Sequence, residues 1–201
     1  MAIEKETQEH IFKAAQRVFQ KKGFDGARMQ EIADEAQINK SMLHYYYRSK
    51  DQLFMAVFQN GVKKIIPQAI KILETDIPLR TKVTRLVGFY FDIFTENPFL
   101  PPFVIHEMNQ HPDRFKVFMG NMNIQLPEIF IEQINDEIET GKMIDIPPDQ
   151  FLINVIGMCV FPLLAQKMVQ VFFHLNDDQF REFLEERKNL VPDLIFKGVS
   201  P

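Results

Sequence analysis

The segment FDGARMQEIADEAQINKSMLHYYYRSKDQLF, residues 24–54, decides how this chain folds. Apolar side chains first recur three and four positions apart, which predicts a short helix with one buried face, made by Met29, Ile32, Ala33 and Ala36. A tight break over residues 37–40 follows, in which Asn39 is suited to cap the next helix. We expect that next helix over residues 40–47.

The two faces of this second short helix differ in character. Leu43 and Tyr47 lie four positions apart and are expected to point back to a core. The other face is polar and carries Lys40, Ser41, His44 and Tyr45. Two short helices joined by a tight turn, the second with a hydrogen-bonding outer face, are the components of a helix-turn-helix. The segment therefore predicts one.

Helical patterns continue on both sides of this segment. Upstream, an apolar stripe that includes Ile11 and Phe19 predicts a helix over residues 7–22, ended by Gly23. Downstream, Ser49 and Gln52 have the spacing of a capping box, and the helix that they begin should kink near Pro67. No segment alternates apolar and polar residues as a strand would, so the sequence predicts an all-α protein.

The composite pattern resembles the DNA-binding segment of the TetR/AcrR family. The similar features are the Ile32-Ala33 pair, the turn over residues 38–41, the Leu-aromatic cluster ending at Tyr47, and the Ser-Lys…Leu start at Ser49. This resemblance covers about the first 60 residues. It implies a three-helix helix-turn-helix domain over residues 1–48 and a helical ligand-binding and dimerisation domain over residues 49–201.

The resemblance also implies roles for individual side chains at the DNA. Four are expected to face the major groove: Lys40, Ser41, Met42 and Tyr45. Five are expected at the phosphate backbone: Arg28, Gln30, His44, Tyr46 and Lys50. The alternative for Tyr45, Tyr46 and Tyr47 is that they only pack in an aromatic core. We expect that structural role for Tyr47 alone.

Three positions depart from the family pattern. Gln37 stands where the family usually has Gly, and a positive φ there would cost a non-Gly residue about 1 kcal/mol or more. Arg28 replaces the usual Ser or Thr and cannot act as a cap acceptor, although its guanidinium can bind a phosphate. His44 replaces a Tyr and could make its phosphate contact pH-sensitive. We expect none of the three to break the fold.

The remaining chain predicts helices near residues 79–95, 99–110, 112–141, 148–173 and 177–197, split or kinked at Pro127 and Pro162 and stopped at Gly141. A stretch rich in Phe and Met suggests a ligand pocket with a few polar groups. Its candidate lining residues are Phe89, Tyr90, Phe94, Phe103, His106, Glu107, Phe118, Met119 and Met122. An ordinary helical core remains an equal alternative.

Residues 155–165 form the longest apolar run, too short to span a bilayer. A helix that is apolar on every side must be covered on every side, which in a chain of this size suggests a second copy. We therefore expect this helix and the last one to form a four-helix homodimer interface. Its candidate residues are Val155, Cys159, Leu163, Phe180, Phe183 and Leu184.

Composition excludes several other classes of protein. The single cysteine, Cys159, rules out an internal disulfide framework and fits the cytoplasm, and no signal peptide is apparent. The net charge of −4 argues against a general nucleic-acid coat protein, although residues 1–60 carry nine Lys and Arg against eight Asp and Glu. His106 and His111 are five positions apart, whereas a zinc-protease motif needs two histidines four positions apart. The sequence also lacks a GxGxxG, a P-loop and a GxSxG motif, so we expect no catalytic, metal or cofactor site.

Together these features predict a ligand-responsive transcriptional regulator, with repression as the expected mode. It would bind near-palindromic operator DNA as a homodimer and respond to a small apolar or amphipathic ligand, with no membrane partner. One alternative is an all-α small-molecule carrier or enzyme that does not bind DNA. Another is a DNA-binding adaptor with a closed core and no ligand.

Overall fold

The computed structural model describes residues 2–98, 100–110, 112–122 and 124–201, except the side chains of residues 2–5, 20, 107 and 114. Within those ranges every regular element is an α-helix, as the sequence predicts. The chain forms two compact units, Met1–Lys64 and Ile65–Pro201. The division falls inside helix α4 (Lys50–Glu74), whereas the sequence analysis placed the functional boundary at Ser49, where that helix begins.

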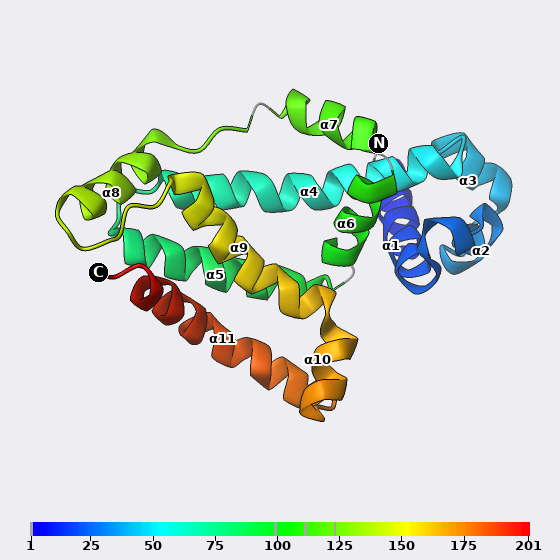
Figure 1. Cartoon of the computed structure of the whole chain (residues 1–201). Coiled ribbons are helices and arrows are strands. Elements are labelled where there is room, and N and C mark those ends of the chain that lie inside the picture. The colour runs from blue at the N-terminus through cyan, green and yellow to red at the C-terminus, as the bar shows by residue number, and fades with distance from the viewer. Residues whose placement is uncertain (1, 99, 111, 123) are drawn as a thin grey trace. The chain divides into compact units, whose positions relative to one another are not determined.

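Unit 1 contains α1 (Ala2–Gly26), α2 (Met29–Glu35), α3 (Lys40–Tyr46) and the first part of α4 (Figure 1). Its core combines one buried stripe from each helix: Ile11, Ala15 and Phe19 from α1, Ile32 and Ala33 from α2, Leu43 from α3, and Leu53, Phe54 and Val57 from α4. Phe54 packs edge-on against Phe19 and Phe24, with ring centroids 5.1 and 4.8 Å away. The predicted apolar stripes of α1 and α2 are thus confirmed as core faces.

The turn between α2 and α3 is built entirely from local hydrogen bonds. Ile38 N–H donates to the Ala33 carbonyl (3.0 Å) and Gln37 N–H to the Asp34 carbonyl (3.0 Å), which together form a Schellman motif. Gln37 has the left-handed φ of 55° that such a motif requires. The Asn39 side chain then accepts from Met42 N–H (2.7 Å) and caps α3, as predicted.

Unit 2 contains the rest of α4 and the helices that follow it, as Figure 1 shows: α5 (Leu79–Glu96), α6 (Leu100–Gln110), α7 (Pro112–Asn121), α8 (Glu128–Glu139), α9 (Pro148–Leu164), α10 (Gln166–Phe173) and α11 (Asp177–Gly198). Pro127 divides α7 from α8, and α8 stops at a second Schellman motif around Gly141, whose φ is 68°. Both interruptions lie where the sequence predicts them. The predicted split near Pro162 comes at Ala165, where the chain bends by 74° between α9 and α10.

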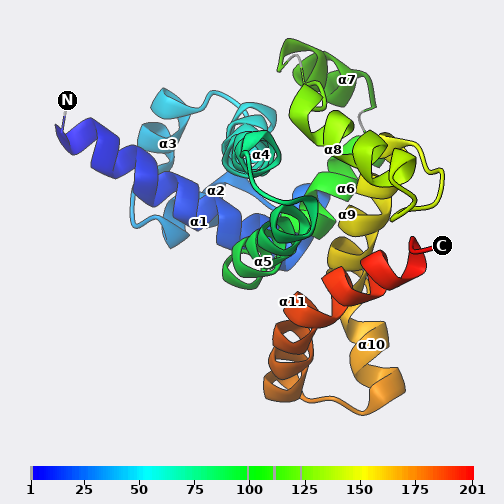
Figure 2. The same cartoon turned by 90° about the vertical axis from the view of Figure 1, so that its left-hand side faces the viewer.

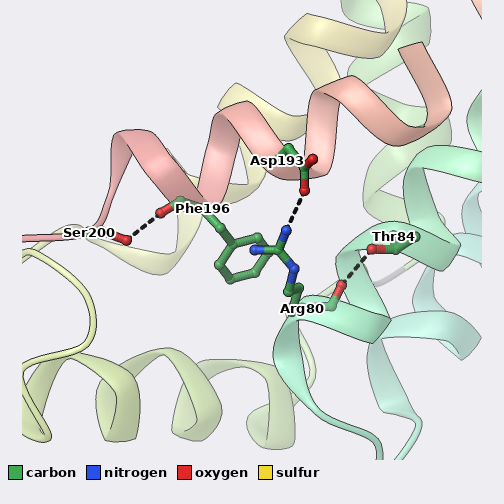
Figure 3. Close-up of polar contacts among 5 residues, drawn as sticks. All are labelled: Arg80, Thr84, Asp193, Phe196 and Ser200. Atoms are coloured by element: carbon green, nitrogen blue, oxygen red, sulfur yellow. Dashed lines mark hydrogen bonds and ion pairs between the residues drawn. The ribbon is translucent and has the colours of Figure 1, made fainter. Parts of the chain in front are cut away.

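The core of unit 2 lies where α5, α9 and α11 pack together. Leu86 and Phe91 of α5, Val155 and Cys159 of α9, and Val191 of α11 are fully buried there. Figure 3 shows a polar link outside this core, in which the Arg80 guanidinium of α5 pairs with Asp193 and stacks over the Phe196 ring of α11. These contacts hold the last helix against α5.

Among the described residues, no single helix is long and apolar enough to cross a membrane. Helices α9 and α10 pass that test of length and composition only as a pair, and the 74° bend separates them. Figure 2 shows α10 turning back into α11 through a short connection. That connection contains left-handed His174, and Asn176 and Gln179 form a capping box at the start of α11.

The left-handed φ of Gln37 yields a stability prediction. Gln37→Gly should raise the free energy of unfolding by about 0.5 kcal/mol, because relief of the left-handed strain slightly exceeds the entropy that glycine loses on folding. Gln37→Val should lower it by about 1 kcal/mol or more, because a β-branched side chain tolerates this φ worst. Urea unfolding followed by circular dichroism measures both, and a valine variant as stable as the glycine variant would contradict the assigned strain.

Candidate nucleic-acid interface

Helix α3 presents most of its predicted DNA-facing side chains to solvent. Leu43 is fully buried and Tyr47, the residue after the helix, is 9% exposed, so this side of α3 points into the core of unit 1. Tyr45, in contrast, is 77% exposed. The other exposed side chains are Lys40, Ser41, Met42 and His44. The structure therefore brings all five of these predicted residues together on the outer part of one short helix.

The three consecutive tyrosines have different environments. Tyr45 packs edge-on against half-buried Tyr46, with ring centroids 5.4 Å apart, and both stay accessible. Tyr47 instead lies edge-on to Phe12 at 5.9 Å, and burial raises the pKa of its phenol. The expectation that only Tyr47 is structural agrees with this placement.

Two more of the residues predicted to bind the phosphate backbone, Arg28 and Gln30, lie at the start of helix α2. Arg28 is the N-cap residue and is exposed, and its side chain makes no capping bond. Gln30 is exposed as well, and its amide donates to Asp34 (2.8 Å). Two ion pairs join α1 to α2, Arg17 to Glu35 at 2.6 Å and Lys22 to Glu31 at 2.8 Å. The hydrogen bond from Lys22 lowers the pKa of Glu31.

Lys50 requires a correction to its predicted phosphate contact. Its ammonium group donates to the carbonyl oxygens of Phe24 (2.8 Å), Ala27 (3.2 Å) and Asp25 (3.4 Å). It also lies 4.3 Å from the centre of the Phe24 ring. An ammonium group has three N–H donors, so these carbonyls occupy them all. Lys50 thus joins the first turn of α4 to the end of α1 and to Ala27 after it, and it has no N–H left to donate to a phosphate.

Helix α4 itself starts almost as the sequence predicts. Ser49 Oγ accepts from Gln52 N–H at 3.1 Å, which is half of the expected capping box. The Gln52 side chain accepts from Arg48 N–H (3.1 Å) rather than from Ser49 N–H. The reciprocal bond is therefore displaced by one residue, and the helix still begins at Lys50.

The predicted ligand-pocket residues have different environments in unit 2. Tyr90 and Phe94 stack at 5.6 Å within the main core of unit 2, where burial raises the pKa of Tyr90 to about 12. Phe89 is half-buried against the same core, Phe103 and Phe118 are buried apart from it, and Met119 is half-buried. His106 is exposed, and the Glu107 side chain lies outside the described residues.

Only Met122 of the predicted set lines a cavity that the structure describes. This cavity has a volume of about 540 Å³ and lies in unit 2, between the second half of α4 and the chain leading into α8. Both of its borders contain a proline that the sequence analysis singled out as a helix breaker, Pro67 and Pro127. A proline that interrupts a helix can leave space between neighbouring elements. These two prolines were therefore the sequence signal for this cavity, which the stretch rich in Phe and Met did not indicate.

The predicted dimer residues lie on α9 and α11, where most of them are buried within a single chain. Val155, Cys159 and Leu163 of α9, and Phe180 and Leu184 of α11, are at most 6% exposed within one chain, and Phe183 is half-buried against the same core. Burial raises the pKa of the Cys159 thiol to about 12. The five buried residues are therefore core residues of one protomer, with no exposed surface to present to a second copy.

Other large apolar side chains of the same region are exposed. On α9 they are Ile153, Phe161 and Leu164, on α10 Met168, Val171, Phe172 and Phe173, and on α11 Leu190 and Leu194. Phe161 is 57% exposed and Phe172 is 70% exposed. The α9 set follows a spacing of eight and three residues, which places it along one helical stripe opposite the core.

Comparison with known proteins agrees with the geometry of unit 1. A sequence model described as bacterial regulatory proteins of the tetR family matches residues 11–57, which include α2, α3 and the turn between them. The match places the DNA-binding unit of this chain in the TetR family. Among its relatives, the helix-turn-helix transcriptional repressor NicS of Pseudomonas putida is 36% identical over 93 residues, 46% of this chain and 43% of NicS.

Two further similarities extend over the full chain. The Bacillus subtilis protein described as “Probable HTH-type transcriptional regulator YttP” is 22% identical over 90% of both chains. The crystal structure of a TetR-like transcriptional regulator from Rhodococcus sp. RHA1 matches with a TM-score of 0.66 and 18% identity, covering 96% of this chain and 94% of that one. The chain therefore shares its fold with that solved TetR-like regulator over both units.

The matching family model is described as regulatory proteins and NicS as a transcriptional repressor, and neither description names an enzyme. The match with NicS spans 43% of the length of that relative. The family model matches residues 11–57, which lie within unit 1, and this makes an all-α carrier or enzyme without DNA binding the weaker hypothesis.

The position of Lys50 predicts that it stabilises unit 1. Lys50→Met should lower the free energy of unfolding by about 1–3 kcal/mol, because three charge-assisted hydrogen bonds to carbonyl oxygens are lost. Lys63→Met, an exposed lysine on the same helix, is the matched control and should change it little. Chemical unfolding followed by circular dichroism measures both, and equal effects would contradict the structural role of Lys50.

Proposed function

We propose that this chain is a ligand-responsive transcriptional repressor that binds near-palindromic operator DNA as a homodimer. The observation that carries the proposal is the outward face of α3, where a seven-residue helix exposes five hydrogen-bonding or apolar side chains over a buried Leu43. Repression is proposed from the similarity to NicS, which is described as a repressor. A regulator of this kind acts on chromosomal DNA, so we also propose the cytoplasm as its location.

The side chains on this face have the chemistry that base recognition needs. Lys40, Ser41 and Tyr45 can donate hydrogen bonds to base edges in the major groove, while Met42 can contact a thymine methyl group. His44 and Tyr46 stand beside them and can reach phosphates. From α2, exposed Arg28 and Gln30 can bind the backbone, with the guanidinium of Arg28 as the strongest phosphate ligand of the set.

A single short helix contacts too few base pairs for selectivity, which favours a two-fold dimer that binds two half-sites. The exposed apolar stripe of α9 and the exposed Leu190 and Leu194 of α11 are suited to meet their copies in a partner chain. Gly157 lies on the same stripe, four residues from both Ile153 and Phe161, and a Cβ at this position would have no described side chain within 4 Å. A glycine there lets a partner helix come close.

The proposed DNA face can be tested by substitution. Tyr45→Ala and Lys40→Ala should each weaken binding to the selected DNA by about ten- to a hundredfold, because a base or phosphate contact is lost in both half-sites. Fluorescence anisotropy measures the affinity, with DNA selected from a random-sequence library by repeated capture on the wild-type protein. Lys40→Ala should also make the affinity less salt-dependent.

Lys142→Ala is the matched control for Lys40→Ala, because it removes an exposed lysine from unit 2 and should leave the affinity unchanged. Circular dichroism should show that all three variants are folded. Wild-type affinity in Tyr45→Ala, or an equal loss in Lys142→Ala, would contradict the assigned face.

The proposed dimer face predicts opposite results for exposed and buried apolar residues. The double substitution Leu190→Glu with Leu194→Glu should give a folded monomer in analytical ultracentrifugation, because charges would be buried at the partner surface. Val155→Glu should instead unfold unit 2, because it places a charge in the core of one chain.

Val117→Glu is the control for the dimer experiment, because Val117 is 65% exposed on α7, away from the proposed face. It should keep the wild-type association state. A wild-type protein that sediments as a monomer at micromolar concentration would overturn the proposed assembly.

A further inference from the structure

Helix α9 contains a carbonyl group that cannot make its usual hydrogen bond within the helix. In an α-helix, the carbonyl oxygen of residue 158 accepts from the N–H of residue 162. Residue 162 is Pro162, which lies inside α9 and has no N–H. The Met158 carbonyl therefore lacks the donor that every regular turn provides, and an unpaired backbone carbonyl weakens a helix at that point.

Arg187 of α11 supplies a donor to this carbonyl. Its Nη2 group donates to the Met158 carbonyl oxygen at 2.9 Å. Helices α9 and α11 pack together, and Figure 1 shows them as a hairpin closed at one end by α10. The bond from Arg187 thus joins the two arms of the hairpin, and a charged donor makes it stronger than a neutral one would.

The surroundings of Arg187 offer its charge little else. None of the ion pairs among the described residues includes Arg187. Burial lowers the pKa of its guanidinium, and its Nε atom is buried without a hydrogen-bond partner. The favourable contacts are the bond to Met158 and the ring of Phe183, whose centre lies 5.6 Å from the guanidinium carbon. A half-buried arginine without a counter-ion is costly, so the bond to Met158 is its main compensation.

Arg187 also lies on the side of α11 that carries exposed apolar residues. Leu190 and Leu194 follow it by three and seven positions and therefore share its side of the helix. On α9, the exposed Phe161 and Leu164 stand on either side of the buried proline and its neighbour. Both pairs of residues belong to the face proposed above to meet a second copy, so the bond from Arg187 joins the two helices that make up this face.

We propose that Arg187 is a positioning residue for the dimer, which replaces the donor that Pro162 lacks and so fixes the last turn of α9 beside α11. This role rests on the dimer in the function proposed above. Without the bond, the turn that carries Phe161 and Leu164 is no longer held in register with Leu190. A binding surface needs such support from neighbouring contacts to keep its side chains in place.

The replacement of the donor is tested by a double-mutant cycle. Arg187→Met removes the donor and keeps an unbranched stem, and it should lower the urea midpoint of unfolding by about 0.5–1 M. In Pro162→Ala, the alanine N–H can bond to the Met158 carbonyl within the helix. Arg187→Met should therefore lower the midpoint less than half as much when it is combined with Pro162→Ala.

Circular dichroism measures the four midpoints, and a repeat at about one tenth of the protein concentration separates the contribution of association. Equal losses from Arg187→Met with and without Pro162→Ala would overturn the replacement of the donor. If Arg187→Met alone does not fold, the double variant decides the question, because its failure to fold would also overturn this role.

The positioning role predicts the sign of a change in association. Analytical ultracentrifugation should show that Arg187→Met raises the dissociation constant of the dimer by about tenfold. If burial of apolar area alone drove association, the same substitution should tighten the dimer, because it makes the face more apolar. A dissociation constant at or below that of the wild type would therefore overturn the positioning role.

Arg181→Met is the matched control for the association experiment. Arg181 is an exposed arginine of α11, six residues earlier and so about 120° around the helix. Its substitution should leave the dissociation constant unchanged, and a loss equal to that of Arg187→Met would overturn the assignment. A wild-type protein that sediments as a monomer would instead overturn the proposed dimer, while the urea cycle would still decide whether Arg187 replaces the missing donor.

Discussion

Helix α3 is held in unit 1 by the buried Leu43 side chain and by the turn that precedes the helix. Because successive residues of a helix point about 100° apart, burial of Leu43 leaves Lys40, Ser41 and Tyr45 on the outer part of the helix. The Schellman motif at Gln37 sets the direction in which the chain leaves α2, and the Asn39 cap sets where α3 begins. The proposed DNA face depends on this one local arrangement.

Helix α4 is the element that belongs to both compact units. Lys50 joins its first turn to Phe24 at the end of α1 and to Ala27 after it. Its second half lines the cavity of unit 2. Pro67 removes one hydrogen bond between these two regions. A helix that is held at one end and weakened in its middle can bend between the two units, as the proposed ligand response requires.

The apolar residues of α9 and α11 serve two purposes on two faces. One face of each helix completes the core of a single chain, as Val155 and Val191 do. The other leaves side chains such as Phe161 and Leu190 in solvent, where an unpaired apolar surface favours association. The exposed α10 residues, including Phe172, extend the apolar surface beyond these two helices.

The sequence by itself determined the all-α fold, the position of α3 and the identity of its outward side chains. These features depend on periodicity and capping within a few residues, as the Asn39 cap and the buried Leu43 demonstrate. Tertiary structure alone decided three other features: the neighbours of Lys50, the face of α9 that enters the core, and the place of the cavity. A long lysine can reach water or a distant carbonyl, and a helix that is apolar on all sides has no period that distinguishes its faces. Which partner each surface meets depends on how helices pack, and packing brings together residues that are far apart in the chain.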